Sequence, residues 1–380
     1  MSTLNVEAIS HPTPGSNVTI NGTTPAGTNQ LGNRNLIING AMQVAQRGTS
    51  SGTGGFGTVD RFNNGYNSGT VTQSQESLSS GSPYDEGFRN FLRFSNTTPS
   101  SDNAAGYRMA RYNIEAQDLA SSGWNYTSSS SYLTLSFWIR ASVSQAYYVY
   151  IKTHDGTAQR YVFSTGTLTA DTWTKVTHQI PGNSNLTINN DNGAGLELNF
   201  SAFWGTDNTD SGVTVDTWGT YSGNTRTPDM TTTWSTTASA TFDITGVQLE
   251  VGEVATPFEH RSYSDELARC QRYYWNVFLG DTESNSAIAQ GSNFNGSASF
   301  FNLYPPVSMR AAPSLEASNA SNYYIAYHNS GSSNVSTLTF DSAAQPNVIE
   351  LSASTGGSGG QAIILRRQNV SAILRFSAEL

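Results

Sequence analysis

Aromatic residues near amide and hydroxyl side chains are the feature of this sequence best suited to ligand chemistry. The rings and one adjacent imidazole gather in a few segments: Tyr147, Tyr148, Tyr150, Trp204, Trp218, Tyr323, Tyr324, Tyr327 and His328. Flat rings stack on sugar faces, and neighbouring Asn, Gln and Thr side chains hydrogen-bond to hydroxyls, so the combination predicts a saccharide site. Our candidate contacts are Tyr323, Tyr324, Tyr327, His328, Tyr148 and Trp204. The alternative use of any single ring is to fill a β core.

Residues with the spacing of an active site are missing from the sequence. It contains no P-loop, HExxH or GxSxG motif, and its five histidines never pair at i, i+2 or i, i+4. Glycoside hydrolysis needs two carboxylates across a cleft, and the sequence alone does not place any two of Glu197, Asp243 and Glu250 opposite each other. We therefore expect no enzyme, no catalytic residue and no cofactor.

Two acidic turns resemble calcium loops in composition, because hard cations bind clustered oxygens. They are residues 190–193 (Asn-Asp-Asn-Gly) and 207–212 (Asp-Asn-Thr-Asp-Ser-Gly). Neither matches an EF-hand, and polar turn chemistry explains both equally well. A structural calcium ion is the alternative to our expectation of no metal.

Composition and charge exclude several classes of protein. Of the 380 residues, 36% are hydrophobic and only 12% charged, and the 11% aromatic share argues against disorder. The net charge is −9, and only Lys152 and Lys175 among the 19 basic residues are lysines. A phosphate backbone or an anionic membrane surface requires clustered cations, so we expect neither as a partner.

The chain ends and the single cysteine indicate where the protein is made. Cys270 has no second cysteine with which to form an intramolecular disulfide. The N-terminus lacks the basic start and apolar stretch of a signal peptide, and no apolar run approaches the roughly 18 residues that span a bilayer. These features predict synthesis in a cytoplasm and no membrane span.

Short alternating segments separated by Gly-, Ser-, Thr- and Asn-rich turns predict strands over residues 34–262. In residues 131–141, one alternating set is wholly apolar and consists of Leu133, Leu135, Phe137 and Ile139. Roughly eight such strands favour one β-sandwich, most simply a jelly roll. Residues 207–240 are long enough to form a lateral loop or flap.

One helix is expected, over residues 264–275, with Ser264 as its N-cap. Leu267, Cys270 and Tyr274 fall on one apolar stripe at i, i+3 and i+7. A helix this short requires a partner for the stripe, and either the sandwich or the same helix of neighbouring chains provides it. Residues 263–275 are therefore our helical connector, and these three residues are candidates for a trimer interface.

The two ends of the chain have different characters. Residues 1–33 contain two short alternating segments that cannot build a core, so they are either a loose tail or a docking segment for a larger assembly. Residues 276–380 return to strands around a proline-bounded corner and predict a smaller C-terminal β head domain.

Several stretches together resemble bacteriophage tail-fibre proteins. The entry stretch at 34–48, beginning Arg34-Asn-Leu-Ile-Ile-Asn-Gly, and the Val59-Asp-Arg-Phe that follows resemble the entry of their jelly-roll module. Residues 135–142 are similar to a middle strand, and residues 242–252 with 255–262 to its closing strand and exit. Residues 266–274, 306–315 and 376–380 resemble the connector and the C-terminal head of such fibres. The first residues look like short virion-attachment segments of marine phages.

The resemblance implies a function and partners. The jelly roll of these fibres is similar to carbohydrate-binding modules, which implies a homotrimeric virion fibre that attaches phage to host cell-surface glycans. It implies location in the virion, on tail or capsid, through contacts of residues 1–33 with another virion protein. The alternatives are a tailspike-type polysaccharide-degrading enzyme and a secreted bacterial lectin. The enzyme is disfavoured because the sequence lacks the regular repeat of a parallel β-helix, and the lectin is disfavoured because the sequence lacks a signal peptide.

Overall fold

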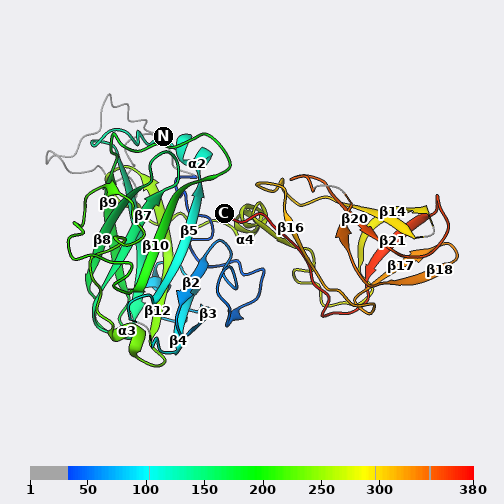
Figure 1. Ribbon diagram of the computed structural model, residues 1–380, viewed down its shortest axis with the longest axis horizontal. Helices are drawn as coiled ribbons and strands as arrows, with labels where there is room; N and C mark the ends of the chain where they lie inside the picture. The colour runs from blue at the N-terminus through cyan, green and yellow to red at the C-terminus, as the bar shows by residue number, and fades with distance from the viewer. Residues whose placement is uncertain (1–32, 102, 296, 342–343) are drawn as a thin grey trace, which may run out of the picture.

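Two β-rich halves lie end to end along the long axis of the molecule, with helix α4 (Tyr263–Gln271) between them (Figure 1). The computed structural model describes residues 33–101, 103–295, 297–341 and 344–380. Apart from Asn33, the docking segment expected at 1–33 lies outside the described residues. The fold class is confirmed: an all-β protein with a jelly-roll sandwich, a short helix and a smaller C-terminal β domain.

The sandwich consists of two six-stranded sheets whose paired strands are antiparallel. The first has the order β1-β3-β4-β12-β6-β9, and the second has the order β11-β8-β7-β10-β5-β2. The strands of the first sheet are β1 (Ser50–Ser51), β3 (Thr70–Ser77), β4 (Asn90–Thr98), β12 (Thr241–Val251), β6 (Tyr132–Ala141) and β9 (Thr174–Pro181). Those of the second are β11 (Gly219–Thr220), β8 (Gln159–Thr167), β7 (Ala146–Thr153), β10 (Ala194–Trp204), β5 (Tyr107–Glu115) and β2 (Asn63–Asn67).

Alternation along the strands builds one large core between the two sheets. In β6, the predicted apolar set from Leu133 to Ile139 is completely buried in this core. Phe137 meets Phe200 of β10 edge to face across the sandwich, with ring centroids 5.0 Å apart. The short helix α3 (Thr233–Thr236) adds the fully buried Trp234 at one end.

The C-terminal domain contains a seven-stranded and a three-stranded antiparallel sheet over a second core. The larger sheet has the order β18 (Gly331–Val335), β17 (Tyr324–His328), β21 (Ala362–Arg367), β14 (Ala287–Asn295), β15 (Ala298–Leu303), β20 (Ile349–Ala353) and β19 (Thr339–Phe340). The smaller sheet has the order β13 (Tyr274–Asn276), β22 (Leu374–Ser377) and β16 (Ser314–Ala317).

The described residues contain three further helices, all of which are very short: α1 (Ser82–Asp85), α2 (Ala116–Ala120) and α3. Helix α4 begins earlier than predicted, because Ser262 and not Ser264 is its N-cap. The Ser262 hydroxyl accepts a hydrogen bond from the Asp265 amide at 3.2 Å. It also ends earlier, at Gln271, because Tyr274–Asn276 pairs with β22 as strand β13. The expected boundary at 275/276 therefore falls inside a strand.

The apolar stripe of Leu267, Cys270 and Tyr274 packs against other residues of the same chain. Cys270 is completely buried in a cluster with Ile38 and Val44 of the sandwich entry segment, and Leu267 packs against the same cluster. Tyr274 is 2% exposed and lies beneath the Arg47 guanidinium, which is 3.4 Å from the ring centroid. The unsatisfied stripe on which the trimer expectation rests is therefore satisfied inside one protomer.

The C-terminal residues return to the sandwich and fasten the two halves together. Glu379 forms buried ion pairs with Arg61 and Arg47 of the sandwich entry segment. The Arg61 guanidinium also lies 3.4 Å from the ring centroid of Tyr273. The side chain of Asn113 on β5 donates a hydrogen bond to the Leu380 carbonyl at 2.9 Å. These contacts bury side chains of both halves where the halves meet, and we call this region, with Arg47, Arg61, Tyr273 and Glu379, the junction.

Candidate functional site

The second sandwich sheet presents a polar and aromatic outer face, on the side opposite the core. Strand register places three cross-strand rows on it: Arg160, Lys152, Glu197 and Asn113; Val162, Tyr150, Asn199 and Arg111; Ser164, Tyr148, Ser201 and Met109. Residues between these positions, such as Ile151 and Leu198, point into the core. We call this set the outer sandwich face, and Figure 1 shows its strands β8, β7, β10 and β5 side by side.

Part of the outer sandwich face is covered by the segment that follows β10. Val213, Val215, Tyr221 and Met230 of this segment pack against Trp204, Tyr150 and Val162. The segment pairs with the sheet edge through β11, where Gly219 lies opposite Arg160. We predicted a lateral loop or flap over residues 207–240, and in the structure this segment covers one side of the outer sandwich face.

The two candidate glycan contacts in the sandwich, Trp204 and Tyr148, differ in their exposure to solvent. Trp204 is 2% exposed, because Tyr107 stacks on it at 4.9 Å and the Arg226 guanidinium lies 4.6 Å from its centroid. It is a buried support for the flap, and our expectation that Trp204 contacts a glycan directly is wrong for this conformation. Tyr148 is partly exposed, and it keeps its place as a candidate.

Glu197 is the buried centre of the polar rows. Its carboxylate accepts hydrogen bonds from Asn199 Nδ2 at 2.8 Å and from the Tyr150 hydroxyl at 3.4 Å, and it lies 3.1 Å from His154 Nε2. Burial by itself favours the neutral acid, but the hydrogen bonds of His154 and Asn199, with the charges of Arg111 and Lys152, lower the pKa of Glu197 to about 2. Glu197 is therefore a fixed anion that holds the surrounding donors in place.

Two partly exposed cations on the same face are in direct contact with no carboxylate among the described residues. Neither Arg111 nor Lys152 forms an ion pair there, although both are partly exposed. Arg111 Nε and Asn199 Oδ1 are also buried without a hydrogen-bond partner within the described part of the chain. Lys152 Nζ lies 4.7 Å from the ring centroid of Tyr221 at the edge of the flap. The face thus combines two accessible cations, whose charges also stabilise the Glu197 anion, with the aromatic ring of Tyr221.

The candidates in the C-terminal domain are divided by strand alternation. Tyr324 is completely buried, and its hydroxyl bonds to the Ser318 amide and the Ile373 carbonyl, so our expectation of a receptor contact there is wrong. Tyr323 packs against the domain core. Tyr327 points to the other side of β17 and is 40% exposed. His328 is held by the hydroxyls of Ser330 and Ser333 at 2.9 and 3.2 Å.

The two acidic turns use their carboxylates internally. Asp191 accepts a hydrogen bond from the Gly193 amide at 2.9 Å, and Asp210 accepts one from the Gly212 amide at 2.7 Å. Both are therefore Asx turns. Across the described residues, no three His, Cys, Asp or Glu side chains gather as metal ligands would. The helices among those residues include none long and apolar enough to cross a membrane.

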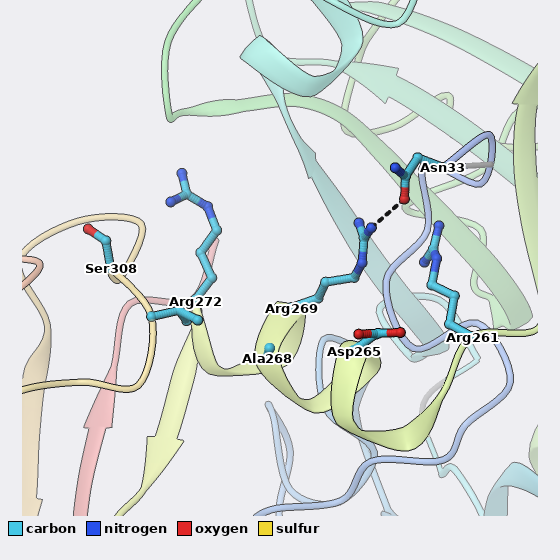
Figure 2. Close-up of a pocket in the computed structure, with 8 residues that line it drawn as sticks. Asn33, Arg261, Asp265, Ala268, Arg269, Arg272 and Ser308 are labelled. Carbon is cyan, nitrogen blue, oxygen red and sulfur yellow. Dashed lines mark hydrogen bonds between the residues drawn. The ribbon is translucent and has the colours of Figure 1, made fainter. Parts of the chain in front are cut away.

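A pocket of about 650 Å³ beside α4 brings together three arginines that the sequence analysis did not single out (Figure 2). Arg272 forms two hydrogen bonds of 2.8 Å with Glu115, and Arg261 bonds to Glu259 at 3.0 Å. Arg269 donates to Asn33 Oδ1 at 2.6 Å, the dashed line in Figure 2. Two of the three charges are met by carboxylates of the chain, so the pocket belongs to the junction of the two halves.

Comparison with known proteins gives similarity at the level of structure. No protein-family model and no curated protein matches the chain. Among solved structures, it is similar to the enzymatically active domain of bacteriophage CBA120 tailspike protein 4, with TM-score 0.32 and 12% identity over 57% of this chain and 21% of that chain. This chain thus spans about a fifth of that domain's length.

Two other similar structures have carbohydrate-binding modules in their names. One is the family 11 module of the cellulase Lic26A-Cel5E of Clostridium thermocellum, with TM-score 0.28 and 16% identity over 56% of this chain and 98% of that chain. The other is the tandem CBM22-1–CBM22-2 domain of Xyn10C from Paenibacillus barcinonensis, with TM-score 0.28 and 10% identity over 93% of this chain and all of that chain.

Proposed function

We propose that this protein is a non-enzymatic glycan-binding protein and that the outer sandwich face is its saccharide site. The observation that carries the proposal is the pair of partly exposed cations, Arg111 and Lys152, which lack an ion pair among the described residues and flank the buried Glu197. Tyr148 and Tyr221 place aromatic surface beside them. Aromatic surface with a few convergent polar groups is the usual composition of a saccharide site.

The charges on the face favour an acidic saccharide. Hydrogen bonds between a cation and a carboxylate are roughly twice as strong as neutral ones, so Arg111 and Lys152 prefer a glycan that carries uronic acid or a similar anionic group. Glu197 supports binding rather than hydrolysis. A general acid in glycoside hydrolysis needs a raised pKa, whereas the pKa of Glu197 is lowered to about 2.

The two lysines of the chain provide a matched test. Lys152→Ala is expected to weaken binding of uronate-containing oligosaccharides roughly 10- to 100-fold, because a hydrogen bond to a charged group contributes about 1.5–3 kcal/mol. Lys175 lies on the other sheet in a solvent-exposed pair with Glu86, and Lys175→Ala should leave binding unchanged. Affinity is measured by calorimetry with each oligosaccharide and its carboxyl-reduced form. Equal affinities of the two variants, or equal binding of the reduced form, contradict the proposal.

The biological setting completes the proposal: a homotrimeric virion fibre that attaches phage to host surface glycans. Its support is the resemblance of about residues 31–380 to tail-fibre proteins, with residues 1–33 proposed to contact another virion protein. Because the α4 stripe is satisfied within one protomer, the proposed trimer contact lies on another surface.

Light scattering on the full chain tests the assembly. We expect roughly three times the protomer mass of 40.8 kDa at micromolar concentration. Leu267→Asp is expected to destabilise the junction inside the protomer, since Leu267 packs against the cluster of Cys270 and Ile38. A monomeric mass for the unaltered chain contradicts the trimer.

A further inference from the structure

A groove of about 730 Å³ lies in the C-terminal domain, away from the outer sandwich face. It is bordered by β13 and by the face of β14, β15 and β21 that points away from the domain core. Its lining includes Trp275, Tyr304, Gln290, Asn302, Ile364 and Arg366. This volume falls within the range of small-molecule pockets, roughly 300–1,000 Å³.

Two aromatic side chains border the groove. Tyr304 follows the end of β15 and is 67% exposed, an unusually open position for a large ring. Trp275 of β13 stacks on Phe376 of β22, with ring centroids 5.3 Å apart and an interplanar angle of 27°. Because Trp275 and Phe376 are also register partners in the sheet, the indole is fixed in place. The groove therefore has one rigid and one accessible aromatic surface.

Two amides form the polar part of the groove on rigid strands. Gln290 and Asn302 are direct register partners of β14 and β15, so their Cβ atoms are about 5 Å apart on the same face. Both residues are exposed, and neither amide has a hydrogen-bond partner among the described side chains and backbone groups. Each amide offers two donors and one acceptor, which suits the hydroxyl groups of a sugar.

The charge of this groove differs from that of the outer sandwich face. Arg366 is the one charged residue among the described residues that line the groove, and its Nη1 donates to the Asn285 carbonyl at 2.9 Å. Glu350 on β20 lies opposite Asn302 and brings a negative charge to the same sheet face. The surroundings are therefore close to neutral and do not favour an anionic ligand.

We infer that this groove is a second saccharide site, specific for neutral oligosaccharides and independent of the outer sandwich face. Tyr304 and Trp275 supply the surfaces on which pyranose rings stack, and Gln290 and Asn302 orient the ligand through its hydroxyls. Exposed amides without partners are suited to a hydroxyl-rich ligand. A purely apolar partner leaves them buried and unpaired, which is unfavourable. Two sites of different charge on one chain let a single molecule engage a polymer at two points and so raise its avidity.

The test uses the full chain and a panel of neutral oligosaccharides built from glucose, mannose, galactose and N-acetylglucosamine. Saturation-transfer NMR is expected to detect binding of at least one member of the panel, and Tyr304→Ala should weaken that binding by about tenfold. The double variant Gln290→Ala/Asn302→Ala should weaken it by a similar factor. Tyr263→Ala is the matched control, because Tyr263 is 51% exposed on α4 and outside the groove.

The independence of the two sites is tested in the same experiment. Lys152→Ala is expected to keep the neutral ligand, while Tyr304→Ala keeps the acidic one. The inference is overturned if the unaltered chain binds no member of the neutral panel, or if Tyr304→Ala and Tyr263→Ala bind it equally. It is also overturned if Tyr304→Ala reduces the mass seen by light scattering, since the groove is then an interface between copies of this chain.

Discussion

Replacing Glu379 by Ala is expected to lower the free energy of unfolding by about 3–5 kcal/mol, the usual cost of breaking a buried ion pair. Glu379 is the buried carboxylate partner of Arg61, whose side chain is only 1% exposed. Burial opposes the charge on that guanidinium, and the ion pair with Glu379 and the rings of Tyr112 and Tyr273 raise its pKa. The variant leaves this cation buried without its partner at the junction of both halves.

A matched glutamate elsewhere in the C-terminal domain serves as the control for this prediction. Glu316 pairs with Arg375 at 3.3 Å, but its side chain is 60% exposed, so Glu316→Ala should cost no more than about 1 kcal/mol. Both variants are compared by equilibrium unfolding in urea. Similar losses for the two glutamates contradict the importance of the junction.

Replacing Trp234 by Ala is expected to cost about 3–5 kcal/mol, because it opens a cavity at one end of the sandwich core. Trp234 is completely buried, and its ring meets Phe242 of β12 edge to face at 6.5 Å. Its indole Nε1 donates to the Thr241 carbonyl at 2.9 Å, so the variant also leaves a carbonyl without its partner. Figure 1 shows α3, which carries this residue, at the end of the sandwich.

Trp173 provides the comparison for Trp234. It lies just before β9 on the outer side of the first sheet, where it is partly exposed and meets Phe91 at 5.5 Å. Trp173→Ala should therefore cost roughly 1 kcal/mol, since solvent occupies much of the vacated volume. The two variants are compared by urea unfolding. A loss for Trp234→Ala as small as that for Trp173→Ala shows that α3 does not close the core.

Strands with a clear alternation of apolar residues were predictable from the sequence. Residues 131–141 match β6 (Tyr132–Ala141) closely, because every second side chain from Leu133 to Ile139 is apolar and buried. Strand β5 was missed although Ala110, Tyr112 and Ile114 show the same period. Arg111 and Asn113 are the polar half of that alternation, and Arg108, at a position of the apolar set, interrupts it. Arg108 is tolerated there because its guanidinium donates hydrogen bonds to the carbonyls of Asn67, Ser68 and Tyr107.

The partner of an apolar stripe is a property of the tertiary structure. The sequence correctly indicates that Leu267 and Cys270 need burial, and it leaves open whether the sandwich or another chain buries them. The structure places them against Ile38 and Val44, more than 220 residues earlier in the chain. Contacts between segments so far apart depend on the packing of whole domains, which local periodicity does not encode.

Local sequence determined that this protein is built of strands, that it has little charge and that aromatic rings lie near amides. Only the tertiary structure decided which of those rings reach solvent. Tyr324 and Tyr327 differ by three positions on one strand, which places them on opposite faces, so one is buried and the other is 40% exposed. Trp204 is buried by a flap, whereas Tyr304, which the analysis of the sequence passed over, is left open at the end of a strand. Exposure is set by the segments that pack over a residue, and local periodicity does not show which segments these are.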